Sequence, residues 1–219
     1  SVLAGHSYIV GETGSGKTSL AIMPALMQLI RGPRDDALPP PIVVIDVKGD
    51  AALFHTVKHE MEQRRKALGI TDPDDPRLAF KYFTPEKSRA SFHFNPFENF
   101  APEVHSDIQL CQLLLESLAL QHGEGYGRSY YSRRARFHLL EVLKSSPQPR
   151  TFADLHDKLR NLLRPRERHE AFELVATVHA LAHYPSLATG PAADPATTIH
   201  MPTLLEHSQC AYFWLPAAV

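Results

Sequence analysis

The stretch GETGSGKT, residues 11–18, fits the phosphate-binding pattern G-x-x-x-x-G-K-[ST] at every fixed position. An apolar run, residues 8–10, precedes it, and a segment with apolar residues at helical spacing, residues 19–30, follows it. A strand, a glycine-rich loop and a helix in this order form a P-loop, whose backbone N–H groups turn inward around phosphate oxygens. The stretch therefore predicts an α/β domain that binds a nucleoside triphosphate.

Two side chains of this loop predict its chemistry. Lys17 is expected to reach the β- and γ-phosphates, and the Thr18 hydroxyl is expected to ligate Mg²⁺. Lys17 and Thr18 are therefore the predicted catalytic residues, with Thr18 as the metal ligand. The alternative is a glycine-rich turn that contains a lysine by coincidence, but the whole pattern in this setting is hard to meet by accident.

Length and composition bound the remaining possibilities. The 219 residues suffice for one α/β domain with an insertion or for two small domains. Lys and Arg number 23 against 24 Asp and Glu, so any argument for nucleic acid has to come from local clustering of charge. Cys111 and Cys210 form no C-x-x-C pattern, which is typical of a reducing compartment. No apolar stretch approaches the roughly 18 residues that cross a bilayer.

Short apolar segments predict the strands of the sheet. Residues 42–47 are almost continuously apolar and β-branched, which is typical of a central parallel strand buried on both faces. Pro24 is expected to kink or interrupt the helix after the P-loop. Further strands are expected at residues 7–10, 78–83 and 210–215, and helices at residues 19–30 and 51–68.

Charged residues lie at the end of strand 42–47. Asp46 follows four apolar residues, as the Mg²⁺-binding aspartate of a Walker B strand does. Alternatively, Asp46, Lys48 and Asp50 shape a turn between the strand and the next helix, beside the nucleotide. Ligands of open α/β sheets bind at the C-terminal ends of the strands, so both interpretations place Asp46 near phosphate.

From residue 104 onward the pattern changes from alternating strands and helices to helices alone. Thr151 is placed to cap one of these helices. Helices are expected at residues 108–120, 133–144, 152–163 and 166–183, which together predict an inserted helical bundle. The chain thus divides into the N-terminal part of a nucleotide-binding domain (residues 1–100), an all-α inserted domain (residues 101–200) and a returning strand of the first domain (residues 201–219).

Arginine and aromatic residues alternate in residues 123–136 of the predicted bundle. Interleaved arginines and tyrosines suit contacts with phosphates and stacking on bases. They suit a solvated helix face or a docking surface between subunits equally well. The residues that would contact a transferred substrate are Arg128, Arg133, Arg134 and Arg136.

Histidines and phenylalanines form two further patterns. His55 and His59, like His179 and His183, are spaced so that both rings lie on one helical face, as zinc-binding helices require. Neither pair has the glutamate of H-E-x-x-H or an evident third ligand, so ordinary histidines are expected. The segment SFHFNPFENF, residues 91–100, predicts either a hydrophobic plug or a contact with a base or a partner.

Several of these segments together resemble the type IV coupling proteins, the hexameric P-loop ATPases of conjugation and type IV secretion. The resemblance runs through GETGSGKT, then IMPAL (residues 22–26), VVIDVKGD (residues 43–50), FNPF (residues 94–97), the helical insertion and YFWLPA (residues 212–217). It covers nearly the whole chain in the family's order. The P-loop occurs in many NTPases, whereas D-x-K-G-[DE] followed by N-P is more specific.

The resemblance implies a RecA-like P-loop NTPase fold with a mainly parallel sheet and an inserted all-α domain. It implies ATP and Mg²⁺ as cofactors, and hydrolysis between subunits of a ring, expected to be a homo-hexamer. It also implies other secretion components or adaptors as partners and DNA or protein as substrate, at the cytoplasmic face of the bacterial inner membrane. The implied nucleotide-binding residues are Gly11, Glu12, Thr13, Gly14, Ser15, Gly16, Lys17, Thr18, Ser19, Asp46 and Lys48.

The resemblance also implies which parts of the machinery this stretch does not contain. In the family the Walker B acidic pair lies on a later strand, so Asp46 is not expected to be the main hydrolytic carboxylate. The 219 residues alone are therefore expected not to hydrolyse ATP appreciably, whereas the intact protein is expected to. The alternatives are a non-catalytic substrate receptor with a vestigial P-loop and, less favoured by the DVKGD turn, a small-molecule kinase.

Overall fold

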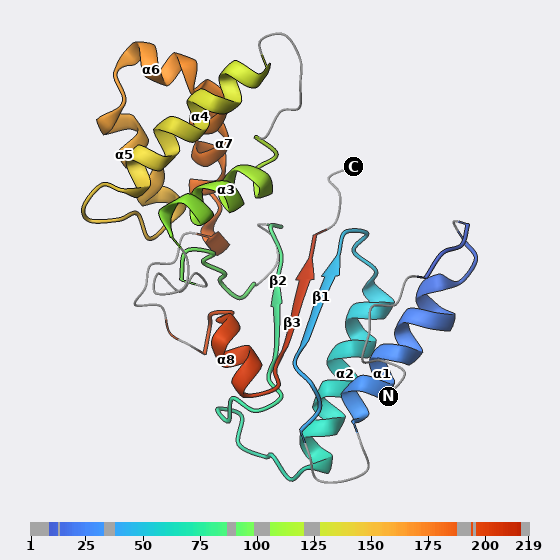
Figure 1. Ribbon diagram of the computed structural model, residues 1–219. Coiled ribbons are helices and arrows are strands. Elements are labelled where there is room, and N and C mark those ends of the chain that lie inside the picture. Colours follow the sequence, from blue (N-terminus) through green and yellow to red (C-terminus); the bar gives the residue numbers. More distant parts are fainter. Residues whose placement is uncertain are drawn as a thin grey trace. The chain divides into compact units, whose positions relative to one another are not determined.

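The computed structural model describes residues 9–12, 14–32, 38–86, 91–98, 106–120, 128–187, 194 and 196–215, the side chains of residues 128 and 129 excepted. The chain divides into two compact units (Figure 1). The sheet unit comprises Ser1–Ala90 and Met201–Val219, and the helical unit comprises Ser91–His200. The boundary between the sheet unit and the helical unit thus follows residue 90, whereas the sequence pattern predicts it at residue 100.

The described strands of the sheet unit form a three-stranded parallel sheet in the order β1-β3-β2. β1 is Ile42–Asp46, β2 is Phe80–Phe83 and β3 is Cys210–Trp214. The last strand in sequence therefore lies between the other two, with Cys210 opposite both Ile42 and Phe80. The prediction of a parallel α/β sheet to which the chain returns after its helical part is confirmed.

Helices accompany this sheet in the same unit. A π-helix, η1 (Lys17–Ile22), continues directly into α1 (Met23–Arg31), and Pro24 lies in the first turn of α1. Proline lacks the N–H that would continue the hydrogen-bond ladder, and it lies next to the point where the winding changes. The expected interruption thus takes the form of a change from π- to α-helical winding. α2 (Ala51–Ala67) packs along α1, and the short α8 (Met201–Glu206) precedes β3.

The core of the sheet unit lies between α2 and one face of the sheet. Phe54 from α2 stacks on Trp214 with ring centroids 4.7 Å apart and meets Tyr212 edge-on at 5.2 Å. Ile42 and Val44 complete this face from β1. Aromatic and β-branched side chains at alternate positions suit a pleated surface covered by a helix.

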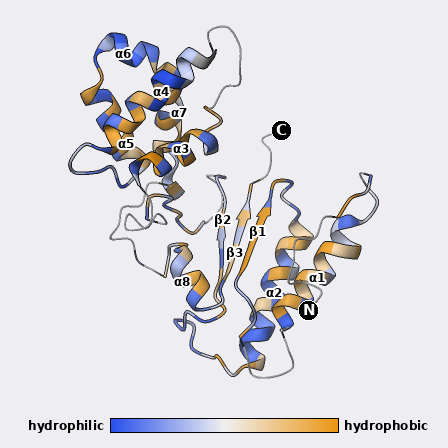
Figure 2. Ribbon diagram, in the orientation of Figure 1, coloured by the Kyte–Doolittle hydropathy of each residue, from blue (hydrophilic) through white to orange (hydrophobic). Residues whose placement is uncertain are grey.

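Two strand predictions need correction. β1 is buried on one face only, since Val43 and Ile45 are 44% and 66% exposed, although Figure 2 colours this strand as hydrophobic. The reason is that β1 is an edge strand in the described sheet and α2 packs on one side of it. The strand expected at residues 7–10 is not seen at Ile9 and Val10, and residues 7 and 8 lie outside the described part.

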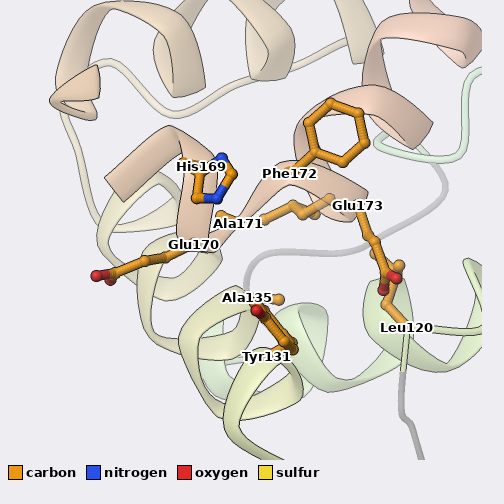
Figure 3. Close-up of a pocket in the computed structure, with 9 residues that line it drawn as sticks. Leu120, Tyr131, Ala135, His169, Glu170, Ala171, Phe172 and Glu173 are labelled. Atoms are coloured by element: carbon orange, nitrogen blue, oxygen red, sulfur yellow. The ribbon is translucent and has the colours of Figure 1, made fainter. Parts of the chain in front are cut away.

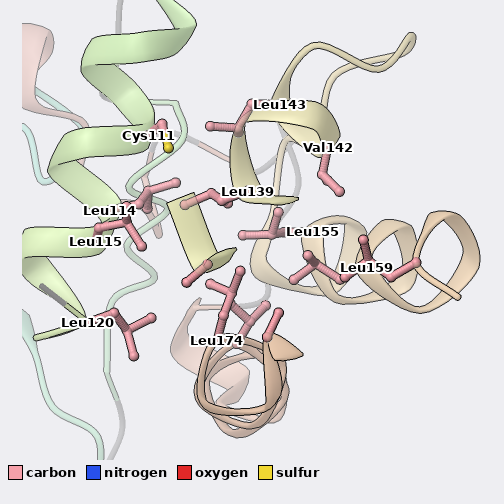
Figure 4. Packing of buried hydrophobic residues seen from close by; sticks show 14 of the residues in the cluster. Cys111, Leu114, Leu115, Leu120, Leu139, Val142, Leu143, Leu155, Leu159 and Leu174 are labelled. Atoms are coloured by element: carbon pink, nitrogen blue, oxygen red, sulfur yellow. The ribbon is translucent and has the colours of Figure 1, made fainter. Parts of the chain in front are cut away.

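The helical unit packs its helices around a leucine-rich core (Figure 4). Leu139, Leu155, Leu159 and Leu174 are fully buried there. Its helices are α3 (Asp107–Ser117), α4 (Arg128–Leu143), α5 (Phe152–Leu162), α6 (Pro165–Glu170), α7 (Phe172–Ala182) and the 3₁₀ turn η2 (Pro185–Leu187). The single helix expected at residues 166–183 is divided at Ala171, whose ψ of 25° leaves the helical region.

Side chains define where these helices begin. The Thr151 hydroxyl accepts a hydrogen bond from the Asp154 N–H at 3.0 Å, so the predicted cap of α5 is confirmed. Just before the bundle, Phe97 meets Phe152 edge-on at 5.2 Å, and the buried Asn95 side chain donates to the Arg150 carbonyl. These contacts favour the plug interpretation of the phenylalanine segment over a contact with a ligand.

Candidate nucleotide-binding site

The P-loop backbone turns at two glycines. Gly14 and Gly16 have φ values of 83° and 78°, in the left-handed region that favours glycine. Gly16 is the N-cap of η1, and a Cβ added to it would come within 2.9 Å of Leu20 Cδ1. The loop therefore favours glycine at position 16 for its backbone conformation, since the exposed Leu20 side chain could move to make room. Thr13 lies outside the described residues.

Lys17 folds back over the loop. Its Nζ donates hydrogen bonds to the carbonyl oxygens of Gly11 at 2.6 Å and Glu12 at 2.5 Å. The Ser15 N–H closes the loop from the other side by donating to the Glu12 carbonyl at 3.2 Å. The ammonium group thus lies against the loop. A phosphate that binds there would replace these carbonyl oxygens as the hydrogen-bond partner of the ammonium group.

The helix that follows begins with π-helical winding. The Met23 N–H donates to the Thr18 carbonyl, five residues back, and the Ser19 hydroxyl donates to the Gly16 carbonyl at 3.3 Å. π-helical turns are rare and occur frequently at functional sites. The first N–H groups of η1 have no helical acceptor and carry the positive end of the helix dipole, so they favour an anion.

Asp46 organises the turn that follows β1. One carboxylate oxygen accepts the N–H groups of Lys48 and Gly49, both at 3.0 Å, and the other accepts the N–H of Asp50 at 2.7 Å. The second oxygen also accepts the Tyr212 hydroxyl at 2.8 Å. Burial, followed by this hydrogen bond to the carboxylate, raises the pKa of Tyr212 above its ordinary value. The geometry favours a turn-shaping aspartate over one that holds a metal.

The same turn presents Lys48 and starts α2. Lys48 is exposed, and Gly49 has a φ of 71°. The Asp50 side chain then caps α2 by accepting the N–H groups of Ala52 and Leu53. Figure 1 draws the P-loop and the C-terminal ends of β1 and β3 at the same end of the sheet unit. Nucleotide contacts from Asp46 and Lys48 stay a prediction.

The predicted substrate arginines belong to the other unit, on α4. Arg134 forms an ion pair with Glu170 of α6, and its guanidinium carbon lies 5.8 Å from the centre of the Phe137 ring. This arginine therefore joins two helices of the bundle. Arg133 and Arg136 are exposed on α4, and the Arg128 side chain lies outside the described part. Their contact with a substrate stays a prediction.

The histidines connect helices and show no metal site. His179 Nδ1 lies 3.1 Å from His156 Nε2, and His183 Nδ1 lies 2.7 Å from the His179 carbonyl oxygen. Within the described ranges, no group of three metal-ligating side chains comes together. His156, on α5, was not singled out from the sequence, because its only signal is a tertiary contact with α7.

Comparison with known proteins finds no family model that matches this chain. It also finds no curated protein with significant sequence similarity. The resemblance to the coupling proteins therefore rests on the motifs and their order. None of the helices in the described ranges combines the length and the apolar character that crossing a membrane requires.

Proposed function

We propose that this chain is the ATP-binding part of a type IV coupling protein. In the intact protein it would recruit DNA or protein substrates to a conjugation or secretion channel and power their transfer by ATP hydrolysis. The expected setting is a ring-shaped homo-oligomer, a hexamer, with other secretion components at the cytoplasmic face of the bacterial inner membrane. Mg²⁺ would accompany the ATP, with Thr18 as its protein ligand.

The observation that carries ATP binding is the local geometry of the P-loop. Gly16 in the left-handed region leads into a helix N-terminus, and the Lys17 ammonium lies over the loop. A triphosphate placed in this loop meets free N–H groups and one cation, the combination that phosphate recognition needs.

A RecA-like arrangement of the sheet unit belongs to the same proposal. It is supported by parallel pairing, by the order β1-β3-β2, and by a chain that returns to the sheet after a long helical excursion. The Asp46 turn adds support, because it follows the C-terminal end of β1, and α/β proteins bind ligands at the C-terminal ends of their strands.

Binding of a fluorescent ATP analogue in the presence of Mg²⁺ tests this assignment on the 219-residue chain. Lys17→Ala removes a charge-assisted contact with phosphate and is expected to weaken binding by about tenfold or more. Lys58→Ala, at an exposed position of α2, is the matched control and is expected to leave the affinity unchanged. Circular dichroism of all three proteins checks that the fold is retained.

Two results would contradict the proposal. One is wild-type chain that is folded but does not bind the analogue. The other is a Lys17→Ala variant that binds the analogue as tightly as the wild type does. That result would mean that the loop does not bind phosphate through Lys17, and it would favour a non-catalytic receptor.

A further inference from the structure

A pocket of about 470 Å³ lies in the helical unit, and none of the predicted substrate arginines lines it. α5, α6 and α7 form it. It is lined by His156, Arg160, Arg168, His169, Phe172, Val175, Ala176 and His179. Two guanidinium groups and three imidazoles thus surround one hollow, and no carboxylate is among its described lining residues.

The cations of this pocket come from helices on two sides. Arg160 is exposed on α5, and Arg168 lies on α6 with its Nε buried and without a hydrogen-bond partner in the described part of the chain. A buried donor without a partner is rare in proteins and indicates a place for an acceptor. Asp157, which lies 3.6 Å from His156, points to the exterior with a side chain 75% exposed and does not line the pocket.

The floor of the pocket is apolar. Phe172 is 65% exposed although it begins α7, and Val175 and Ala176 follow it on the same helix. Exposed aromatic rings beside arginines are typical of contact surfaces for other proteins. The pocket therefore offers an apolar contact and cationic contacts to one ligand.

A second pocket lies beside the first one and differs from it in the charge of its lining residues (Figure 3). It shares His169 and Phe172 with the first pocket, but Glu170 and Glu173 also line it. The described lining residues thus include two glutamates on one side of Phe172 and two arginines on the other. A ligand with carboxylates is favoured on the arginine side, with its apolar part against the phenylalanine ring.

We propose that the pocket between α5, α6 and α7 binds a short acidic peptide segment of a protein partner, with carboxylates on Arg160 and Arg168 and an apolar side chain on Phe172. Arginine pairs with carboxylates through two parallel hydrogen bonds, and both Arg160 and Arg168 line the pocket. Glu170 and Glu173 line the neighbouring pocket, so the positive surface does not extend past Phe172 as a long nucleic acid would need.

Fluorescence anisotropy with two labelled peptides tests the proposal on the full 219-residue chain. One peptide alternates glutamate and leucine, and the other alternates lysine and leucine. Only the acidic peptide is expected to bind, and salt is expected to weaken its binding. The double variant Arg160→Gln/Arg168→Gln is expected to lose about tenfold or more in affinity. Phe172→Ala is expected to lose about fivefold through the apolar contact.

Arg150→Gln, at an exposed position of the same unit, is the matched control and should bind as the wild type does. Equal affinity of the folded double variant and the wild type would overturn the proposal. Equal losses in the control and the double variant would also overturn it, because binding would then reflect general charge. Binding of a single-stranded oligonucleotide in place of the acidic peptide would overturn it in favour of a nucleic-acid site.

Discussion

The P-loop region and the core of the helical unit differ in how their residues are held. Around the loop, Val10 and Leu20 are 75% and 78% exposed, whereas Leu139 and Leu155 are fully buried in the helical core. The loop is specified by residue types that suit contacts with a phosphate, and the core by apolar residues that contact one another. A motif therefore indicates chemistry without indicating packing, and a periodic pattern does the reverse.

The largest difference in stability is expected between two leucine-to-alanine variants, one in the helical core and one beside the P-loop. Leu139→Ala deletes buried atoms from the helical core and is expected to lower the free energy of unfolding by about 2–5 kcal/mol. Leu20→Ala, beside the P-loop, is expected to change it by less than about 0.5 kcal/mol. Urea unfolding followed by circular dichroism measures both. Comparable losses would show that Leu20 is buried in solution and would break the comparison.

A smaller effect is expected at the turn after β1, where the Asp46 carboxylate makes a buried hydrogen bond with the Tyr212 hydroxyl. Asp46→Ala leaves the Tyr212 hydroxyl and three backbone N–H groups without their acceptor, and is expected to lower stability by about 2–3 kcal/mol. Tyr212→Phe removes only the hydroxyl and is expected to lower it by about 1 kcal/mol. Thermal unfolding measures both variants. A larger loss in Tyr212→Phe than in Asp46→Ala would contradict the turn-shaping role.

The smallest effect is a pH dependence in the helical unit. Burial, and then the nearby positive charges of His179 and Arg160, lower the pKa of His156 from its ordinary value of 6.5, although Asp157 opposes this. His156 therefore takes up a proton more readily in the unfolded chain than in the folded chain. The stability contributed by neutral His156 is complete above pH 6.5, and it is lost as the pH falls below that value.

Thermal unfolding at about pH 7.5 and about pH 5.5 measures this contribution. The midpoint of the wild type is expected to fall more over this interval than that of His156→Gln. The other histidines are common to both proteins, so the difference reports on His156 together with its contact to His179. Equal shifts would mean that His156 titrates alike in the folded and unfolded chains.

Much of the fold was predictable because its signals are local. The parallel strands, α2 and the Thr151 cap follow from apolar runs, helical spacing and a capping residue within a few positions of one another. The partial burial of β1 was not predictable, since an apolar β-branched run is the same whether a strand is central or at an edge. The break at Ala171 was missed because alanine favours helices and neither glycine nor proline marks the position.

The candidate site shows the same division. The residue types of the P-loop were evident from sequence, and the structure adds the hydrogen bonds of Lys17 to its own loop. The residues alone left two alternatives for Asp46, the resemblance favoured the turn, and the structure adds the Tyr212 hydroxyl on its carboxylate. That contact joins residues on β1 and β3, which lie at opposite ends of the chain, so no local pattern contains it.

The sequence by itself determined the glycine-rich loop, the strand and helix types and the helical character of α3, α4, α5 and α7, because each depends on neighbours along the chain. Only the tertiary structure decided which face of β1 is covered, what the Asp46 carboxylate binds, and that arginines and histidines of α5, α6 and α7 share one pocket. The physical reason is that burial, acceptor partners and charge clustering are set by residues distant in sequence.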